Sequence, residues 1–381
     1  MQLTSKLPNL ETTIFTKMSA LAKEYNALNL SQGFPNFQGD PKIISLVTKA
    51  MQEGQNQYAP MMGNPKLLEA ISNKLANSYN VFYHPENEIM VTVGASQAIF
   101  SAITAFVHKD EEVIIFKPAY DCYEPAVQLN GGRVVDIQLH GPSYRIDWED
   151  VKSEINPKTR MIIVNSPTNP TGTIFTEEDM LQLQEITKGT DVIILSDEVY
   201  EHMIYDGQKH QSAMLFPDLQ KRCVLTFSFG KTFHHTGWKT GYCCAPKELM
   251  DEIVKVHMFS VFSVNHPVQI ALAEYLNDSE HYEYLNDFYQ QKRDLFLDLV
   301  KDSKFSYEPA QGTYFQILNY KTISDENDVK FAERLTKENG IASIPISVFN
   351  KDKLDNKDLR FCFAKKDDTL KRAAEILNAI E

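Results

Sequence analysis

The sequence predicts an α/β protein built around a mostly parallel β-sheet. Apolar runs of strand length recur along the chain without polar alternation, which is typical of strands buried on both faces. Segments with helical spacing separate these runs, as the connections of a parallel sheet require. The predicted strands span residues 89–93, 113–116, 161–164, 192–195 and 224–227.

Three segments carry helical periodicity. The first directly follows Gly94-Ala95-Ser96 and continues to Phe106, the second spans 285–299, and the third spans 370–380. We expect helices over all three, with Asp367 and Asp368 as cap residues at the start of the third.

Domain boundaries carry no signal in the composition, because no Gly/Ser linker and no internal repeat occurs. The long helix after residue 280 is the most suitable joint between two units. We therefore expect a large α/β domain over residues 45–280. A smaller α+β domain would combine residues 1–44 with residues 281–381.

The charge balance excludes several classes of partner. The 381 residues carry 38 Lys and Arg against 51 Asp and Glu, which gives a net charge of −13. So acidic a chain is unsuited to binding nucleic acid or an anionic membrane through general electrostatics. We expect no nucleic-acid partner, no membrane partner, and small molecules as ligands.

Cysteine usage and the first residues bear on the cellular compartment. Five cysteines, without C-x-x-C spacing, fit neither a disulfide framework nor a zinc site. Cys243 and Cys244 lie in an apolar run, where we expect them to pack in the core. The start, MQLTSKLPNL, lacks a signal-peptide layout, and no run approaches the 18 apolar residues of a membrane span. A reducing, cytoplasmic location is expected.

Two predicted strands are followed by anion-binding and amide groups. Gly94-Ala95-Ser96-Gln97 opens a helix after strand 89–93, and free N–H groups at a helix start favour a phosphate. Ser96 as a simple N-cap is the alternative. The turn 165–172 presents two side-chain amides after strand 161–164, although turn chemistry alone explains most of its composition.

The next two strands are followed by a carboxylate and a lysine. Asp197 and Tyr200 come after strand 192–195, and helix capping would also explain Asp197. Lys231 comes after strand 224–227, with Lys239 eight residues further on. A lone lysine is usually a solvated charge, but partial burial beside a second cation would lower the pKa of Lys231 and make its amine nucleophilic.

A metal site is not expected. His234 and His235 are adjacent, so they would point to opposite sides of an extended strand, and no third ligand has useful spacing. Glu198 and His202 are four residues apart but lack the zinc-protease pattern. We expect them to form a surface pair.

Three motifs in a fixed order identify a family. They are Asn-x-Pro-x-Asn-Pro-x-Gly from Asn165, Ser-Asp-Glu-Val-Tyr from Ser196, and Ser-x-Gly-Lys-Thr-x-x-x-x-Gly-Trp-Lys-x-Gly-Tyr from Ser228. The chain thereby resembles the class I aminotransferases of pyridoxal phosphate fold type I, closest to the methionine and kynurenine aminotransferase subgroup. The resemblance extends from Asn29-Leu30-Ser31-Gln32-Gly33-Phe34-Pro35 through Tyr58-Ala59-Pro60 to Leu359-Arg360-Phe361-Cys362-Phe363. It implies that fold, and pyridoxal phosphate as cofactor.

The resemblance implies roles around the cofactor. Lys231 would bind it covalently and, once released, move a proton between the substrate Cα and the cofactor's C4′. Asp197 would keep the pyridine nitrogen protonated, so that the ring accepts electrons from the broken Cα–H bond. Tyr120 would stack on the ring, and Tyr200 and Asn169 would hydrogen-bond its hydroxylate. The phosphate would be held by the backbone of Ala95, Ser96 and Gln97, by Ser228 and Lys239, and by Tyr58 of the partner subunit.

The resemblance also implies the substrate contacts. Arg360 would bind the α-carboxylate through two parallel N–H bonds, helped by Asn169 and the backbone N–H of Gly33. Phe15 and Phe262 would form an apolar wall suited to a thioether or an aromatic ring.

Two positions bear on specificity. Many relatives carry arginine where this chain has Lys239, but a lysine still neutralises phosphate and the resembled subgroup also uses it. No Lys or Arg occurs between Lys255 and Lys292, where aspartate-selective relatives supply a second cation. An unpaired aspartate side chain would lose hydration there without compensation, so methionine and aromatic donors are expected instead.

The resemblance therefore implies a homodimeric aminotransferase. It would move the amino group of methionine or an aromatic amino acid to a 2-oxo acid by a ping-pong mechanism. The alternative is a pyridoxal phosphate-dependent C–S β-lyase acting on cysteine conjugates, which release of pyruvate and ammonia would reveal. A non-catalytic regulator of this fold usually appends a DNA-binding module, and the chain offers no basic segment for one.

Overall fold

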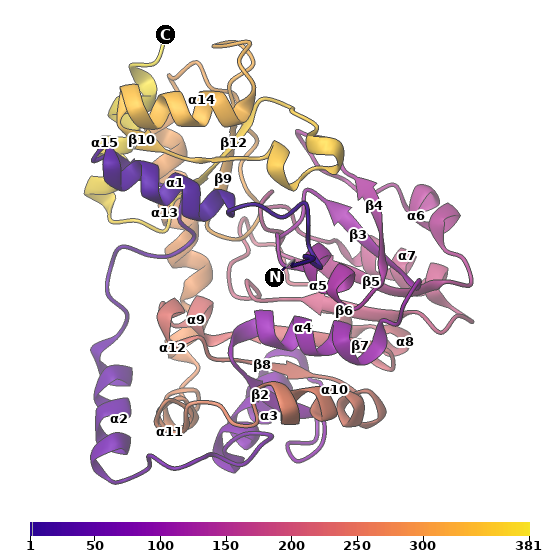
Figure 1. Ribbon diagram of the computed structural model, residues 1–381. Helices are drawn as coiled ribbons and strands as arrows, with labels where there is room; N and C mark the ends of the chain where they lie inside the picture. The colour runs from indigo at the N-terminus through magenta and orange to yellow at the C-terminus, as the bar shows by residue number, and fades with distance from the viewer. Residues whose placement is uncertain (2) are drawn as a thin grey trace.

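The computed structural model describes Met1 and residues 3–381 and centres on a seven-stranded β-sheet (Figure 1). Its order is β2-β8-β7-β6-β5-β3-β4, and adjacent strands are parallel except in the two pairs that β8 forms. This confirms the predicted α/β class with a mostly parallel central sheet. The strands are β2 (Ile89–Thr92), β3 (Glu112–Lys117), β4 (Arg133–Gln138), β5 (Thr159–Asn165), β6 (Ile193–Asp197), β7 (Cys223–Ser228) and β8 (Gly241–Cys244).

The five predicted apolar runs all form strands of the central sheet. The other two strands of this sheet, β4 and β8, have no predicted counterpart. Strand β4 lies at the edge of the sheet and carries polar side chains such as Asp136, so no apolar run announces it. Strand β8 is only four residues long. Its Cys243 and Cys244 are fully buried between neighbouring strands, as expected of core residues.

Helices cover both faces of the sheet, because successive strand residues point to opposite sides. In β3, Val113 and Ile115 pack into one apolar cluster, and Ile114 and Phe116 pack into another. The helices of this part of the chain are α3 (Pro65–Tyr79), α4 (Gly94–Phe106), α5 (Tyr123–Leu129), α6 (Trp148–Glu154), α7 (Glu177–Thr187), α8 (Pro217–Gln220), α9 (Phe229–Thr232), α10 (Lys247–Ser260) and α11 (His266–Tyr275).

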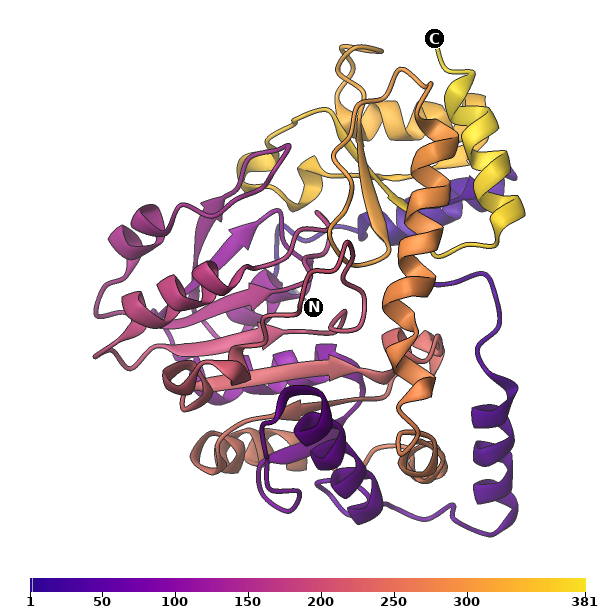
Figure 2. The ribbon, with the colours of Figure 1, turned by 180° about the vertical axis from the view of Figure 1, so that it is seen from behind.

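Segments from the two ends of the chain form two smaller sheets. Strand β1 (Leu28–Asn29) pairs in parallel with β10 (Ile341–Ala342), and the antiparallel sheet β11-β12-β9 lies beside this pair (Figures 1 and 2). The long helix α13 rises along the molecule to reach α15, against which it packs. The remaining elements are α1 (Ile14–Glu24), α2 (Pro41–Gln52), α12 (Glu280–Glu283), α13 (Leu285–Val300), β9 (Phe315–Asn319), α14 (Asp328–Arg334), β11 (Ile344–Pro345), β12 (Asp358–Cys362) and α15 (Asp367–Asn378).

The three predicted helices are confirmed as α4, α13 and α15, but the predicted caps are wrong. Lys366 precedes α15 without a capping side chain, and Asp367 and Asp368 lie inside its first turn. There their charges face the positive end of the helix, and Asp367 pairs with Lys292 of α13 at 2.5 Å. Ser96 also lies inside a helix, since α4 begins at Gly94, so the N-cap interpretation fails. No helix within the described residues combines the length and apolarity needed to cross a membrane.

The expected surface pair of Glu198 and His202 is wrong, because Glu198 is buried and has other partners. Glu198 is fully buried; it accepts hydrogen bonds from the Ser196 hydroxyl (2.8 Å) and the Ala213 N–H (3.0 Å), and its other oxygen lies 2.7 Å from His210 Nε2. His202 instead lies 3.5 Å from the carboxylate of Glu201. Residues four apart are neighbours only on a helix, but a turn follows β6. Sequence spacing therefore predicts neither the partners of Glu198 nor its burial.

His234 and His235 were expected to point to opposite sides of an extended strand, but they do not lie on a strand. His234 has a positive φ of 61°, and His235 stacks on Trp238 with ring centroids 4.0 Å apart. The described residues contain no cluster of three His, Cys, Asp or Glu side chains able to hold a metal ion.

A buried ion pair joins helix α3 to the turn after β6. Lys74 Nζ lies 2.5 Å from Glu201 Oε1, with both side chains almost fully buried, and the Tyr79 hydroxyl donates to the other oxygen at 2.5 Å. The Lys74 ammonium pairing and the Tyr79 hydrogen bond outweigh desolvation and lower the pKa of Glu201 to about 2. The pair is charged at neutral pH, and each partner depends on the other.

Glu201→Gln should therefore destabilise the protein by about 3 kcal/mol, because it leaves the Lys74 ammonium buried without its carboxylate. The measurement is the midpoint of urea unfolding. Asp251→Asn is the matched control, since it breaks a pair of equal length (2.5 Å) that is half-exposed. Equal midpoints for the two variants would contradict the assignment.

Candidate active site

A cavity of about 260 Å³ opens at the carboxyl ends of strands β5, β6 and β7. This is where a parallel sheet binds ligands, because the loops that follow the strands diverge there. Most of the predicted site residues surround it. Those that line the cavity are Gly33, Ala95, Ser96, Tyr120, Asn169, Asp197, Tyr200, Ser228, Lys231 and Lys239.

Asp197 is a buried carboxylate at the end of β6. Tyr123 donates a 2.6 Å hydrogen bond to one oxygen, and Thr226 lies 3.5 Å from the other. It forms no ion pair with any residue that the structure describes. Loss of hydration is the largest effect and raises the pKa of Asp197 to about 6. The group is therefore suited to a cationic ligand atom, which would stabilise its charge.

Lys231 follows the carboxyl end of the neighbouring parallel strand, in the short helix α9 after β7. Its Nζ donates to the Tyr314 hydroxyl (2.9 Å) and to the Gly33 carbonyl (3.3 Å). Burial lowers its pKa to about 8, and the charges of Arg360 and Lys239 act in the same direction. A substantial fraction of the amine is thus neutral and nucleophilic near physiological pH.

The part of the cavity at the start of helix α4 is suited to binding an anion. Helix α4 starts at Gly94, whose φ of +68° suits glycine, and its first N–H groups lack intrahelical partners. A Cβ on Gly94 would lie 3.6 Å from Lys239 Nζ, so this ammonium lies beside the helix start. The Gln97 side chain turns away, with Nε2 2.7 Å from Ser101 Oγ, so its backbone alone belongs to this end.

Arg360 lies on β12 and contacts the cavity-lining side chain of Asn169. Its guanidinium is buried, lies 3.9 Å from the ring centroid of Phe315 and 5.1 Å from that of Phe15, and donates to the Asn169 side chain at 2.7 Å and the Ser31 carbonyl at 3.0 Å. Its Nε–H has no partner among the described residues. A buried, unpaired N–H is costly, so a bound anion would stabilise the group.

Five predicted residues do not line this cavity, namely Phe15, Tyr58, Gln97, Phe262 and Arg360. Tyr58 is 81% exposed and Phe262 is 48% exposed, with their rings 5.7 Å apart in an edge-to-face arrangement. Neither lines the cavity of the chain to which it belongs. The Phe15 ring packs against the Arg360 guanidinium, and the apolar wall that Phe15 and Phe262 would form stays a prediction.

Three residues of the site carry no predicted role, although Asn165 is one of the two amides that the turn 165–172 presents. Asn165 donates to the Asp197 carbonyl and accepts from the Asn169 N–H, both at 2.8 Å, and so joins two strand ends. Its place at the head of the Asn-x-Pro-x-Asn motif could have indicated this. Tyr123 and Tyr314 bind Asp197 and Lys231, but ordinary aromatic residues in apolar surroundings give no local signal.

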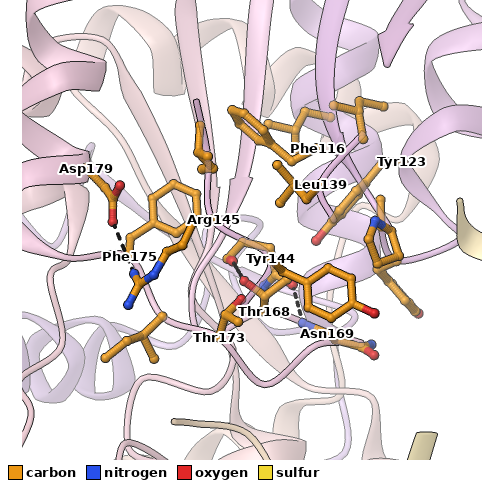
Figure 3. Close-up of a pocket in the computed structure, with 18 residues that line it drawn as sticks. Phe116, Tyr123, Leu139, Tyr144, Arg145, Thr168, Asn169, Thr173, Phe175 and Asp179 are labelled. Atoms are coloured by element: carbon orange, nitrogen blue, oxygen red, sulfur yellow. Dashed lines mark hydrogen bonds and ion pairs between the residues drawn. The ribbon is translucent and has the colours of Figure 1, made fainter. Parts of the chain in front are cut away.

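A second cavity lies behind Asn169 and measures about 30 Å³ (Figure 3). Apolar side chains such as Phe116, Leu139 and Phe175 form its wall, and Arg145 lies 3.9 Å from Asp179 at one side. This volume holds about two water molecules. The cavity of about 260 Å³ is the candidate active site, because it brings together the predicted side chains at the strand ends.

Comparisons with known proteins agree with this geometry. The family model for aminotransferase class I and II matches residues 25–377. A methionine aminotransferase of Escherichia coli is 45% identical and aligns over 99% of this chain and 98% of its own length. Human kynurenine–oxoglutarate transaminase 3 is 31% identical over 98% of this chain and 89% of its own. The crystal structure of Escherichia coli YbdL, described with a methionine aminotransferase function, superposes with a TM-score of 0.97 at 45% identity and 99% coverage of both chains.

The altered acidity of Lys231 can be measured directly. In the full chain without ligand, we expect its acetylation by trace acetic anhydride to be half-maximal near pH 8, because only the neutral amine reacts. Peptide mass spectrometry resolves Lys231 from Lys247, an exposed lysine whose pairing with Asp251 raises its pKa. A Lys231 midpoint at or above that of Lys247 would contradict the burial argument.

Proposed function

The chain belongs to the class I and II aminotransferases, a family that uses pyridoxal phosphate, and we propose that it moves the amino group of methionine or an aromatic amino acid to a 2-oxo acid. The transfer proceeds by a ping-pong mechanism, in which the donor leaves before the 2-oxo acid binds. The cavity that holds Lys231 and the buried Asp197 carboxylate supports this, because both substrates would occupy it in turn.

The charges of the cavity fit the cofactor. Asp197, a buried carboxylate without a paired cation, suits the protonated ring nitrogen, and the start of α4 with Lys239 and Ser228 suits the phosphate. Tyr120, Asn169 and Tyr200 lie between these ends, where the ring and its hydroxyl would be held. When bound, pyridoxal phosphate supplies an electron sink for the bond that breaks at the substrate Cα.

The protein side chains then divide the work of proton transfer and binding. Lys231 would hold the cofactor covalently and, when released, would move the proton between the substrate Cα and the cofactor's C4′. Its lowered pKa matches this task, because an amine near half protonation can both accept and donate a proton. Asp197 keeps the ring nitrogen protonated. Arg360 binds the substrate carboxylate and is oriented by Asn169, while the Gly33 N–H helps.

One observation carries the donor preference: the guanidinium that binds the carboxylate is surrounded by aromatic rings. Phe315 and Phe15 flank Arg360, and among the described residues the cations that line the cavity itself are Lys231 and Lys239. Burial of a thioether or ring against this surface is favourable. A second carboxylate would lose hydration there. The methionine aminotransferase relative supports the same choice.

With one fixed 2-oxo acid, kcat/KM for methionine and phenylalanine should exceed that for aspartate at least about tenfold, which is a difference of roughly 1.4 kcal/mol in activation free energy. The reason is that the aspartate carboxylate would lose hydration against the apolar surface without compensation. Steady-state kinetics of the three donors checks this. Phe15→Ala should lower kcat/KM for methionine.

The matched control for this experiment is Phe82→Ala, which truncates an aromatic side chain that is 64% exposed. It should leave all three donors unchanged. A specificity constant for aspartate equal to or above those of methionine and phenylalanine would overturn the proposed preference.

We also propose that the active form is a homodimer with shared sites. Exposed aromatic side chains gather at Tyr58 and Phe262, and Phe259, three residues before Phe262, is 88% exposed. Large exposed apolar groups of this kind are typical of protein interfaces. In the dimer, Tyr58 would reach the phosphate end and Phe262 the apolar wall of the neighbouring site.

Mixing the inactive variants Tyr58→Ala and Lys231→Ala should restore up to about one quarter of wild-type activity, since half of randomly formed dimers are hybrids with one intact site each. Activity is measured after subunit exchange is verified by mass. Exchange without recovery would place Tyr58 outside the neighbouring site.

A further inference from the structure

The free Lys231 amine lies in a triangle of hydrogen bonds with Tyr314 and Gly33. The Tyr314 hydroxyl donates its one hydrogen to the Gly33 carbonyl at 2.7 Å, so its oxygen lone pairs remain for Lys231 Nζ, which donates to it at 2.9 Å. Nζ also donates to the same Gly33 carbonyl at 3.3 Å. The amine thus faces two acceptors that are hydrogen-bonded to each other.

The Gly33 carbonyl is fixed in place by side chains from the C-terminal part of the chain. Residues 31–34 form a bent segment, called the strap here, whose successive carbonyls each accept a side-chain hydrogen bond. Arg360 binds the first, Lys365 the second (3.4 Å) and fourth (2.7 Å), and Tyr314 the third. A Cβ at Gly33 would approach Phe315 Cζ to 2.8 Å, so glycine is required for this close approach.

Tyr314 is equally well fixed. It is fully buried before β9, and its backbone carbonyl accepts from the Phe363 N–H at 3.0 Å. Its ring packs on those of Tyr200 and Phe315, with centroids 5.2 and 4.9 Å away. Burial raises the pKa of Tyr314 far above its ordinary value, so the phenol keeps its hydrogen.

We propose that Tyr314 is a positioning residue that, with the Gly33 carbonyl, holds the Lys231 amine whenever this amine is not bonded to the cofactor. The proposal rests on the proposed function, in which Lys231 alternates between a bonded and a free state. In the free state the two acceptors keep a long, flexible side chain directed at the cavity and stabilise its protonated form.

Several other charged and titratable groups act on the amine and stay unchanged in the test. The phenol of Tyr200 is 5.6 Å from Nζ at its ring centroid. The groups whose charges shift the acidity of Lys231 are Cys362, Arg360, Lys239 and Asp197. Because these groups are the same in Tyr314→Phe, a shift in the pKa of Lys231 in that variant reports the loss of the Tyr314 hydroxyl.

The decisive experiment compares Tyr314→Phe with Tyr289→Phe in the full chain freed of its cofactor. Competitive acetylation across pH, read by peptide mass spectrometry, gives the titration midpoint of Lys231. Tyr314→Phe should lower it by about one pH unit, since the ammonium loses an acceptor worth more to the charged than to the neutral form. Tyr289→Phe should leave it unchanged, because this hydroxyl is buried without a partner among the described residues, although its ring lies 5.6 Å from that of Tyr314.

A second readout uses the loaded enzyme. Tyr314→Phe should lower kcat about tenfold with KM for methionine nearly unchanged, because substrate binding by Arg360 is preserved and proton transfer by a less well-held amine is slowed. An unshifted Lys231 midpoint, or a shifted midpoint with unchanged kcat, would overturn the proposal. Failure of the wild type to transaminate would instead overturn the proposed function, since the acetylation measurement does not depend on turnover.

Discussion

The active site depends on one buried carboxylate that has no cation of its own. Asp197 ends a central strand, accepts a hydrogen bond from Tyr123, and is deprived of water without gaining an ion pair from the described residues. Such a charge is unfavourable unless a ligand completes it. The sheet around it stabilises the position: β6 lies between β5 and β7, and Asn165 at the end of β5 binds the Asp197 carbonyl.

The acidic residues next to Asp197 show how the chain tolerates so much negative charge in one turn. Glu198 and Glu201 are buried, and His210 and Lys74 pair with them. Each of these carboxylates has a partner, whereas Asp197, on the cavity side, has none among the described side chains. The turn thus separates carboxylates that stabilise the fold from the one available for ligand chemistry.

The opposite rim of the site is held by interactions between the two ends of the chain. Arg360 and Lys365, near the C-terminus, bind the carbonyls of the strap 31–34, and the Cys362 N–H donates to the Leu30 carbonyl at 2.8 Å. Tyr144 adds a link between the β4 side of the large sheet and β12 by donating to Asp358 at 2.6 Å. Arg360 is consequently placed by contacts that span most of the sequence.

The amino-acid sequence by itself determined the α/β class, the five buried strands and the residues at their carboxyl ends. These features are local, because an uninterrupted apolar run and a motif after it report on their own few residues. Strand β4 escaped prediction because an edge strand needs no apolar run. Glu198 and His202 were misplaced because burial of a charge depends on partners that arrive from elsewhere in the chain.

Only the tertiary structure decided which groups surround Lys231 and Asp197. Tyr123, Tyr314 and the strap 31–34 approach them from separate elements, and hydrogen bonds across such separations leave no pattern in the sequence. The acidity of both groups follows from this burial. A side chain's type is written in the sequence, but its hydration and its neighbours exist only after the chain has folded.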